Sequence, residues 1–411
     1  MEKIKIDYDN LIKIVARSLD LVGVDDAYHA QRVAYMASLV SKKMGYESSF
    51  VEDLTNAALL HDCGISSTLE HKHLIDEFLW TGAEAHCHRG YEYLAHCKPL
   101  AKFADYIKLH HTPWHELKNL DLSEAEKTAN NLIFLCDRLD ALYAFARETS
   151  SLDSVVLNRQ ELLDKIHERK GYLFKSDLCD ALLDLAETDA FWFGLRDEYL
   201  GSVVANFNPN DGKSEFLEPK RVRSIGTFLA RIIDAKSHYT NDHSIRVSAL
   251  AGEVARRMNL SEETQVNLEI AGLLHDVGKL RIPDDILEKR GKLSDVERIT
   301  INQHALDTKY VLELLFPNSL IAKWASSHHE KLNGTGYPFG LTENDLDVES
   351  RIMVCCDIFQ AVTQNRPYRP PMSLENAIGI LDDMAEKGEV DRDIVNVMKE
   401  YGDELYEISS T

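Results

Sequence analysis

Two short stretches of the chain place a histidine directly before an aspartate, at His61-Asp62 in LLHDCGI and at His275-Asp276 in LLHDVGKLRIP. Adjacent residues on a helix point about 100° apart, so the two side chains of such a pair cannot both approach an ion from the same side. The pair can, however, contact two ions that lie side by side. An aspartate has two oxygen atoms with which to bridge such ions, and neutral imidazoles can complete each coordination shell.

Both pairs belong to a longer repeat. Each half of the chain contains, in the same order, a histidine, a His-Asp pair, a histidine, a His-His pair and an aspartate. In the first half these residues are His29, His61, Asp62, His86, His110, His111 and Asp137, and in the second half they are His243, His275, Asp276, His304, His328, His329 and Asp357. The first two histidines are 32 residues apart in both halves, and the third precedes the His-His pair by 24 residues in both. Histidine occupies only 17 of 411 positions, so each half is interpreted as one copy of the same domain.

Each set has more ligands than a structural zinc ion needs, since such an ion takes four. Two metal ions about 3.5 to 4 Å apart, with open positions for water and phosphate, fit the number better. The spacing therefore predicts a dinuclear metal site.

The elements that must position these residues have a helical period almost everywhere. In HSIRVSALAGEVARRM, apolar Val247, Leu250, Ala251 and Val254 recur at steps of three and four, which is typical of an amphipathic helix. No alternating strand pattern of convincing length appears. Prolines, a glycine and polar residues interrupt the pattern over 206–219. The prediction is an all-α fold with two tandem helical domains, 1–205 and 220–411, joined by a linker over 206–219.

Composition limits the partners and the compartment. With 44% apolar and 28% charged residues the chain has the composition of a globular protein. A formal net charge of −22 argues against nonspecific binding to DNA or to anionic membranes. No apolar run approaches the 18 or so residues of a membrane span, so the expected location is cytoplasmic. The seven cysteines lack any CxxC spacing and are expected to be reduced and mostly buried.

The second half resembles the HD-GYP branch of the HD metal-dependent phosphohydrolases over about 190 residues. The motifs that carry the resemblance are HSIRV, LLHDVGKLRIPDDILEKRGKL, HALDT, SSHHEKLNGTGYP and RIMVCCDIFQAVTQNRPYR. The resemblance implies an all-α phosphodiesterase that hydrolyses a bacterial cyclic dinucleotide, cyclic di-GMP or 3′3′-cyclic GMP-AMP, to the linear dinucleotide.

The same resemblance implies roles for particular residues. The metal ligands would be His243, His275, Asp276, His304, His328, His329 and Asp357, with Asp276 as the bridge. Asp276 and Lys279 would be catalytic. Lys279 would contact the phosphate, while Arg366 and Arg369 would approach the nucleotide. The loop with Gly336, Tyr337 and Pro338 is implied to meet a protein partner as well. Imidazole and carboxylate ligands without a thiolate suggest iron or manganese as the two divalent ions.

Several positions depart from the family pattern. Tyr239 stands where some members have an acidic ligand for a third metal, which favours two metals in the second half. Gln360 replaces the usual aspartate beyond the last ligand, where it can alter the support of a ligand without removing one. The first half has Asp25 and Asp140 at these two positions.

The first half lacks other features of the pattern. Ile65 stands in place of the lysine, HHTPWHEL lacks the GYP loop, and nothing resembles RPYR. The first half is therefore expected to bind metal but to be poorly equipped for a cyclic dinucleotide. Its hypothetical role is regulation or the formation of a homodimer.

Two other functions remain open from the sequence. One is a different HD-type nucleotide phosphohydrolase in which the first half shares the work. The other is a sensor that binds a cyclic dinucleotide without hydrolysing it.

Overall fold

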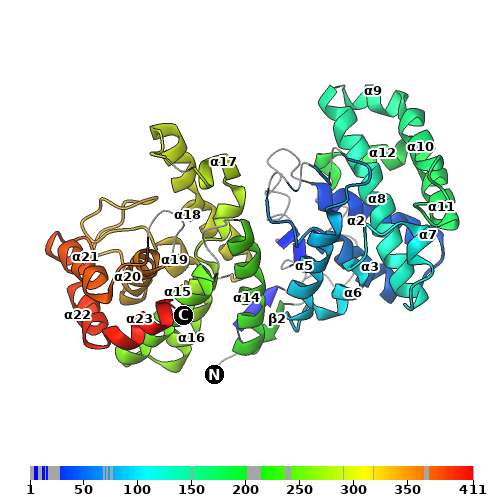
Figure 1. The fold of residues 1–411 in the computed structure, drawn as a ribbon. Coiled ribbons are helices and arrows are strands. Elements are labelled where there is room, and N and C mark those ends of the chain that lie inside the picture. Colours follow the sequence, from blue (N-terminus) through cyan, green and yellow to red (C-terminus); the bar gives the residue numbers. More distant parts are fainter. Residues whose placement is uncertain are drawn as a thin grey trace. The chain divides into compact units, whose positions relative to one another are not determined.

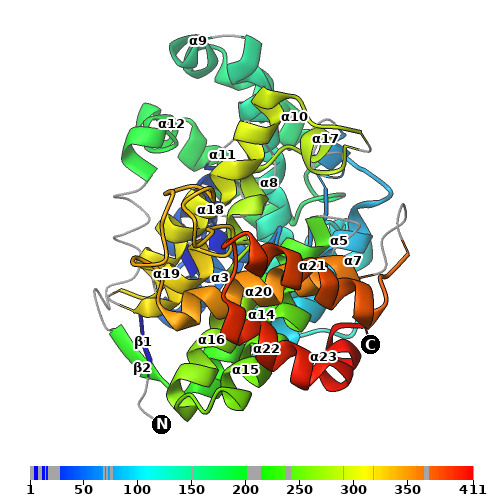
Figure 2. The ribbon, with the colours of Figure 1, turned by 90° about the vertical axis from the view of Figure 1, so that its left-hand side faces the viewer.

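The computed structural model describes residues 4–7, 12–13, 15–16, 28–67, 70, 73–74, 77–149, 151–200, 214–236, 242–289, 291–317, 319–364 and 370–410. Their contacts divide the chain into two compact helical units, drawn in Figures 1 and 2. One unit is Tyr8–Lys213, called the first domain below. The other, called the second domain, joins Met1–Asp7 to Ser214–Thr411. The predicted all-α fold is confirmed.

Helices are the main secondary structure of the described residues in both domains. The first domain contains α2 (His29–Lys43), α3 (Ser48–Leu60), α5 (Ala83–Ala95), η2 (Ala101–Phe103), α6 (Ala104–Ile107), α7 (Trp114–Leu117), α8 (Glu124–Thr149), α9 (Leu152–Leu157), α10 (Arg159–His167), α11 (Ser176–Ala186) and α12 (Asp189–Gly194). The second domain contains α14 (Pro219–Lys236), α15 (His243–Arg257), α16 (Glu262–Leu274), η3 (Val277–Arg281), α17 (Asp284–Leu287), α18 (Asp295–Leu315), α19 (Leu320–Ser326), α20 (Val348–Thr363), α21 (Leu374–Glu386), α22 (Arg392–Glu400) and α23 (Gly402–Ser410).

One small sheet was not expected from the sequence. Strand β1 (Ile4–Asp7) pairs antiparallel with β2 (Ser214–Leu217), with Ile4 opposite Leu217 (Figure 2). Four residues are too few for a visible alternation of apolar and polar side chains, and the partner strand is about half the chain away. The segment expected as a linker, 206–219, therefore contains β2 and the first residue of α14. The division into 1–205 and 220–411 stays a prediction, and in the structure the first seven residues group with the second domain.

The ligand-bearing helices follow from the sequence pattern. All four apolar residues of the predicted stripe on α15 are buried, which confirms that helix. Helix α15 packs against α16, and α2 packs against α3 in the first domain. Ser294 and Glu297 form a reciprocal capping box that fixes the start of α18. These contacts position the helices that carry the histidines.

A glycine after each His-Asp pair allows a close approach of two elements. A Cβ atom on Gly278 would lie 2.0 Å from the carbonyl oxygen of His304, and one on Gly64 would lie 2.0 Å from that of His86. Only a residue without a side chain fits there. The turn that contains each His-Asp pair can therefore lie directly on the helix that carries the third histidine.

The seven cysteines are all free and buried, as predicted. Among the described residues, no helix combines the length and the apolar character needed to cross a membrane.

Candidate metal centres

The seven predicted ligands of the second domain come from elements that converge on one buried centre. His243 is the first residue of α15, and His275 and Asp276 follow the end of α16. His304 lies within α18, and Asp357 lies within α20. The pair His328 and His329 follows the end of α19.

These ligand atoms form two groups. The first contains His243, His275 and Asp276, and the second contains His304, His328 and His329, with the atoms of each group within 4.8 Å of one another. The Nε2 atoms of His243 and His275 are 3.2 Å apart. Those of His304 and His328 are 3.1 Å apart. Two cradles of imidazoles therefore lie side by side.

Asp276 lies between the two cradles. Its Oδ2 is 3.5 Å from Nε2 of His243 and 3.3 Å from that of His275. Its Oδ1 is 3.5 Å from Nε2 of His304 and 3.7 Å from that of His328. Each oxygen thus faces a different cradle, which is the geometry that a bridging carboxylate requires.

Hydrogen bonds on the far side of four of the five rings fix their tautomers. Nδ1–H of His275, His304 and His328 donates to the carbonyl oxygen three residues earlier, at 2.8, 2.6 and 2.6 Å. Nδ1–H of His243 donates to Oε1 of Gln360 at 2.5 Å. Because a carbonyl oxygen can only accept, the Nδ1 atoms carry the protons and the Nε2 lone pairs point into the centre.

Facing lone pairs need a proton or a metal ion between them. Neutral rings of His243 and His275 would place two Nε2 lone pairs 3.2 Å apart, a repulsive arrangement that a shared cation removes. Oδ1 of Asp276 is also buried without a hydrogen-bond partner among the described residues, and such an atom is costly unless a cation satisfies it. The residues present therefore fit a pair of divalent metal ions.

The ionisation of the second-domain centre agrees with this fit. Burial lowers the pKa of His304 to about 3 and of His329 to about 4, so both rings are neutral near pH 7. Burial also disfavours the charged form of His275, but the carboxylates of Asp276 and Asp357 raise its pKa to about 10. The negative field of the two carboxylates attracts a positive charge, which a metal ion can supply.

Two features that were predicted to contact the substrate or a partner, Lys279 and the loop with Tyr337, lie at this centre. Lys279 donates from Nζ to Oδ2 of Asp276 at 2.6 Å, and its side chain is partly exposed. The ring of Tyr337 lies 4.7 Å from that of His329, so the loop with Gly336, Tyr337 and Pro338 borders the second cradle. Arg366 and Arg369 lie outside the described residues, as do Tyr239 and Asp25.

Glu330 holds this loop, a role that sequence reasoning missed. Its carboxylate is fully buried and accepts the backbone N–H of Phe339 at 2.7 Å and of Leu341 at 2.9 Å. A Cβ on Gly336 would lie 2.5 Å from Cα of Glu330, which shows how closely the loop folds back. The signal in the sequence is only an acidic residue directly after the His-His pair.

The first domain repeats the same cradle. Nε2 of His29 and His61 are 3.3 Å apart, and Nε2 of His86 and His110 are 3.1 Å apart. Asp62 lies between them, with Oδ2 3.2 Å from Nε2 of His61 and Oδ1 3.5 Å from that of His86. His111 and Asp137 complete the set, with Nε2 of His111 3.7 Å from Oδ2 of Asp137. All seven predicted residues are therefore brought together.

The surroundings of this first-domain cradle differ in charge. Nδ1–H of His29 donates to the carboxylate of Asp140 at 2.7 Å, and Arg32 donates to the same carboxylate at 2.6 Å. Arg138 donates to Asp137 at 2.9 Å. The lysine position is taken by buried Ile65. The guanidinium groups of Arg32 and Arg138 thus offset the negative charge of Asp140 and Asp137 at the first-domain centre.

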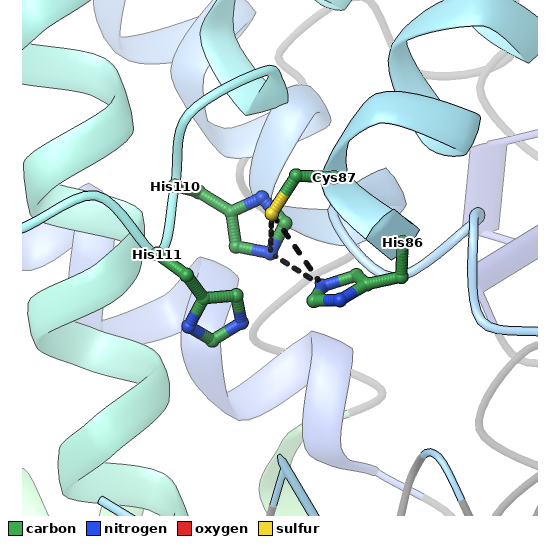
Figure 3. A group of neighbouring side chains, drawn as sticks. All are labelled: His86, Cys87, His110 and His111. Atoms are coloured by element: carbon green, nitrogen blue, oxygen red, sulfur yellow. Dashed lines mark hydrogen bonds between the residues drawn. The ribbon is translucent and has the colours of Figure 1, made fainter. Parts of the chain in front are cut away.

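A thiol that sequence reasoning missed also lies there. Cys87 is buried beside His86, and its Sγ atom is 3.8 and 3.9 Å from Nε2 of His86 and His110 (Figure 3). Its only signal in the sequence is its position next to a predicted ligand.

Comparison with known proteins agrees with the duplicated centre. Two family models, each described as an HD domain, match residues 227–394 and 26–142. The 3′3′-cGAMP-specific phosphodiesterase 1 of Vibrio cholerae is 36% identical over 395 residues, covering 96% of this chain and 92% of that protein. The chain belongs to the HD domain family of two-domain cyclic dinucleotide phosphodiesterases.

Other members of the HD family match in different ways. A cyclic di-GMP phosphodiesterase of Pseudomonas aeruginosa is 32% identical over 185 residues, which is 44% of either chain. The crystal structure of a cyclic GMP-AMP-specific phosphodiesterase from V. cholerae covers 97% of this chain and 98% of its own, with a TM-score of 0.64 at 23% identity. That likeness shows that the HD fold is shared along both domains. HD domains are metal-dependent phosphohydrolases, so the family also supports the use of divalent metal at these centres.

Proposed function

We propose that the second domain hydrolyses a 3′3′-linked cyclic dinucleotide to the linear dinucleotide, with 3′3′-cyclic GMP-AMP as the preferred substrate. The observation that carries the proposal is the position of Asp276, whose two oxygens face two separate imidazole cradles while Lys279 contacts it from the partly exposed side. The relative that matches along nearly the whole chain is specific for 3′3′-cGAMP.

The ligands named above would hold two divalent ions, of which iron and manganese suit the nitrogen and oxygen ligands. Such ions lower the pKa of water and draw charge from a phosphate. The residues of the chain position the reaction. The four Nδ1–H hydrogen bonds orient the rings, and Asp276 sets the distance between the cradles. Lys279 places a positive charge where it can meet a phosphoryl oxygen as charge develops there.

The first domain is proposed to be non-hydrolytic. It has Ile65 where the second domain has Lys279, and Thr112 follows its His-His pair where Glu330 holds the GYP loop in the second domain. Without a lysine and that loop, a cyclic dinucleotide would find no matching contacts beside the metal ligands.

Cyclic di-GMP is the second candidate substrate. The relatives named for it match less than half of this chain, such as the P. aeruginosa protein, which matches 44% of it. The two substrates differ in one base, so the contacts that distinguish them must lie outside the metal cradle.

A matched pair of variants tests the assignment. His275→Ala/Asp276→Ala is expected to lower hydrolysis of both cyclic dinucleotides by more than about 100-fold, because loss of ligand-supporting residues alone costs about 10- to 100-fold. His61→Ala/Asp62→Ala is the control and should keep activity. Product formation would be followed by chromatography and mass spectrometry with each substrate. Equal losses in both variants would refute the division of labour, and turnover in the first variant would refute the site. Tight binding without any product in the metal-loaded wild type would support the sensor alternative.

A further inference from the structure

The cluster around Cys87 has no counterpart in the second domain. Cys87 follows His86 on α5, and its sulfur points toward the same space as the rings of His86, His110 and His111 (Figure 3). Ligand atoms of these four residues all lie within 4.8 Å of one another. The position that corresponds to Cys87 in the second domain is Ala305, whose side chain has no ligand atom.

The distances within the cluster suit one tetrahedral ion. Zinc–nitrogen bonds of about 2.0–2.1 Å and zinc–sulfur bonds of about 2.3 Å place nitrogen atoms roughly 3.3 Å apart and sulfur roughly 3.6 Å from nitrogen. The observed separation of Nε2 atoms of His86 and His110 is 3.1 Å. Those from Sγ of Cys87 to the same two atoms are 3.8 and 3.9 Å. These three separations are within a few tenths of an ångström of a zinc site, and the ligand atom of His111 lies within 4.8 Å of the others.

The ring of His86 lacks the support that its counterpart has. Nδ1 of His86 is buried with no hydrogen-bond partner among the described residues. Nδ1–H of His304 instead donates to the carbonyl oxygen of Ile301 at 2.6 Å. Histidines that bind metal usually have their second nitrogen fixed by such a partner. A metal ion at Nε2 of His86 would leave Nδ1 as it is, so this ring would be oriented by the metal bond and by packing.

The two centres differ in ligand chemistry, because only the first domain offers a soft thiolate ligand, that of Cys87. A thiolate favours zinc over manganese or magnesium, whereas imidazole and carboxylate alone do not select in this way. Three imidazoles and one thiolate also fill the four positions of a structural zinc site, which leaves no open position for water or substrate.

We propose that the first domain holds one thiolate-ligated zinc ion, bound by His86, Cys87, His110 and His111. On binding, the S–H proton of Cys87 is released to solvent and the sulfur–zinc bond forms. The ion is structural or regulatory, because its four protein ligands close the site. This inference stands independently of the substrate proposed for the second domain.

A competing arrangement uses the same histidines without sulfur. Oδ1 of Asp62 lies 3.5 Å from Nε2 of His86 and 3.9 Å from that of His110. An ion held by this carboxylate would leave the thiol of Cys87 free. The two arrangements differ in whether sulfur bonds to the metal, which spectroscopy detects directly.

The first test is cobalt substitution in the full-length protein. Wild type loaded with Co²⁺ should show a near-ultraviolet sulfur-to-cobalt charge-transfer band. Cys87→Ser and Cys87→Ala, the latter creating the side chain found in the second domain, should both lose it. Cys179→Ala removes a buried thiol on α11 instead and should retain the band. Absence of the band in wild type, or its persistence in Cys87→Ser, would overturn the proposal.

A second measurement tests the thiolate site without any variant of Cys87, in case those variants do not fold. Zinc-edge X-ray absorption needs only an intact Cys87, and it can be recorded on His275→Ala/Asp276→Ala so that the second-domain centre contributes little. A sulfur shell at about 2.3 Å is expected. A shell of nitrogen and oxygen alone would indicate the Asp62 arrangement and contradict the thiolate site.

Discussion

The two domains present almost the same ligand atoms from corresponding helices, but their surroundings differ. In the second domain, Asp276 has Lys279 beside it and the GYP loop borders the centre. In the first domain, the equivalent carboxylate has Ile65 nearby, and cationic Arg32 and Arg138 bind the supporting carboxylates. The helical scaffold therefore sets the metal cradle, whereas residues around the cradle determine which chemistry it can perform.

The corresponding rings of His61 and His275 differ in pKa. Burial lowers the pKa of His61 to about 4, and the opposing effect of Asp62 does not overcome it. For His275, Asp276 and Asp357 outweigh burial and raise the pKa to about 10. The neighbouring rings of His29 and His110 lower the pKa of His61 further. In the first domain the carboxylates of Asp140 and Asp62 outweigh burial at His29 instead and raise its pKa, so the two centres hold a proton on different rings.

The largest difference expected between the two domains comes from the lysine. Lys279→Ala should lower kcat by about 100- to 1000-fold, which is the usual cost of losing one donor to a developing negative charge. Metal content should stay near that of wild type, because Lys279 is not among the metal ligands. Steady-state kinetics together with metal analysis separates these effects.

The matched change in the first domain is Ile65→Ala, which should leave hydrolysis unchanged. A loss of activity there comparable with that of Lys279→Ala would mean that the first domain takes part in catalysis. Loss of bound metal in Lys279→Ala would instead assign the lysine a structural role at Asp276.

The next effect concerns the partner of the first histidine. Gln360→Ala removes the acceptor of Nδ1–H of His243, so metal affinity of the second domain should fall by about 10- to 100-fold. Gln360→Asp should restore it, because Asp140 supports His29 in this way in the first domain. Competition with a chelator would measure the affinities. Equal affinities in wild type and Gln360→Ala would show that this hydrogen bond does not orient the ring.

Local patterns in the sequence were enough to predict the cradles. Intervals between histidines are preserved in both halves, and helical periodicity places them on a rigid scaffold, so all fourteen predicted ligand positions come together in two clusters. The departure at Gln360 was also visible, because it occupies a fixed distance from Asp357.

Features that depend on tertiary contacts could not be predicted from the sequence. Strands β1 and β2 pair across about 210 residues, and neither is long enough to show alternation. Cys87 has no CxxC partner, so its place among the ligands depends on how α5 meets the His-His turn. Glu330 binds backbone groups nine and eleven residues later, and backbone amides leave no mark in the residue types.

Glu330 gives the smallest and most local of the expected effects. Glu330→Gln replaces one of two carboxylate oxygens by an NH₂ group, so one of the backbone N–H groups of Phe339 and Leu341 loses its acceptor. A buried polar group without a partner costs about 1–3 kcal/mol, and the second domain should unfold at a lower temperature by roughly 2–12 °C. Glu343→Gln, on the exposed side of the same loop, is the control and should unfold as wild type does. Because the loop borders His329 without supplying a metal ligand, kcat/KM should fall while metal content stays constant. An unchanged unfolding temperature with reduced metal content would contradict this account, since it would place Glu330 among the groups that support the cradle instead of those that hold the loop.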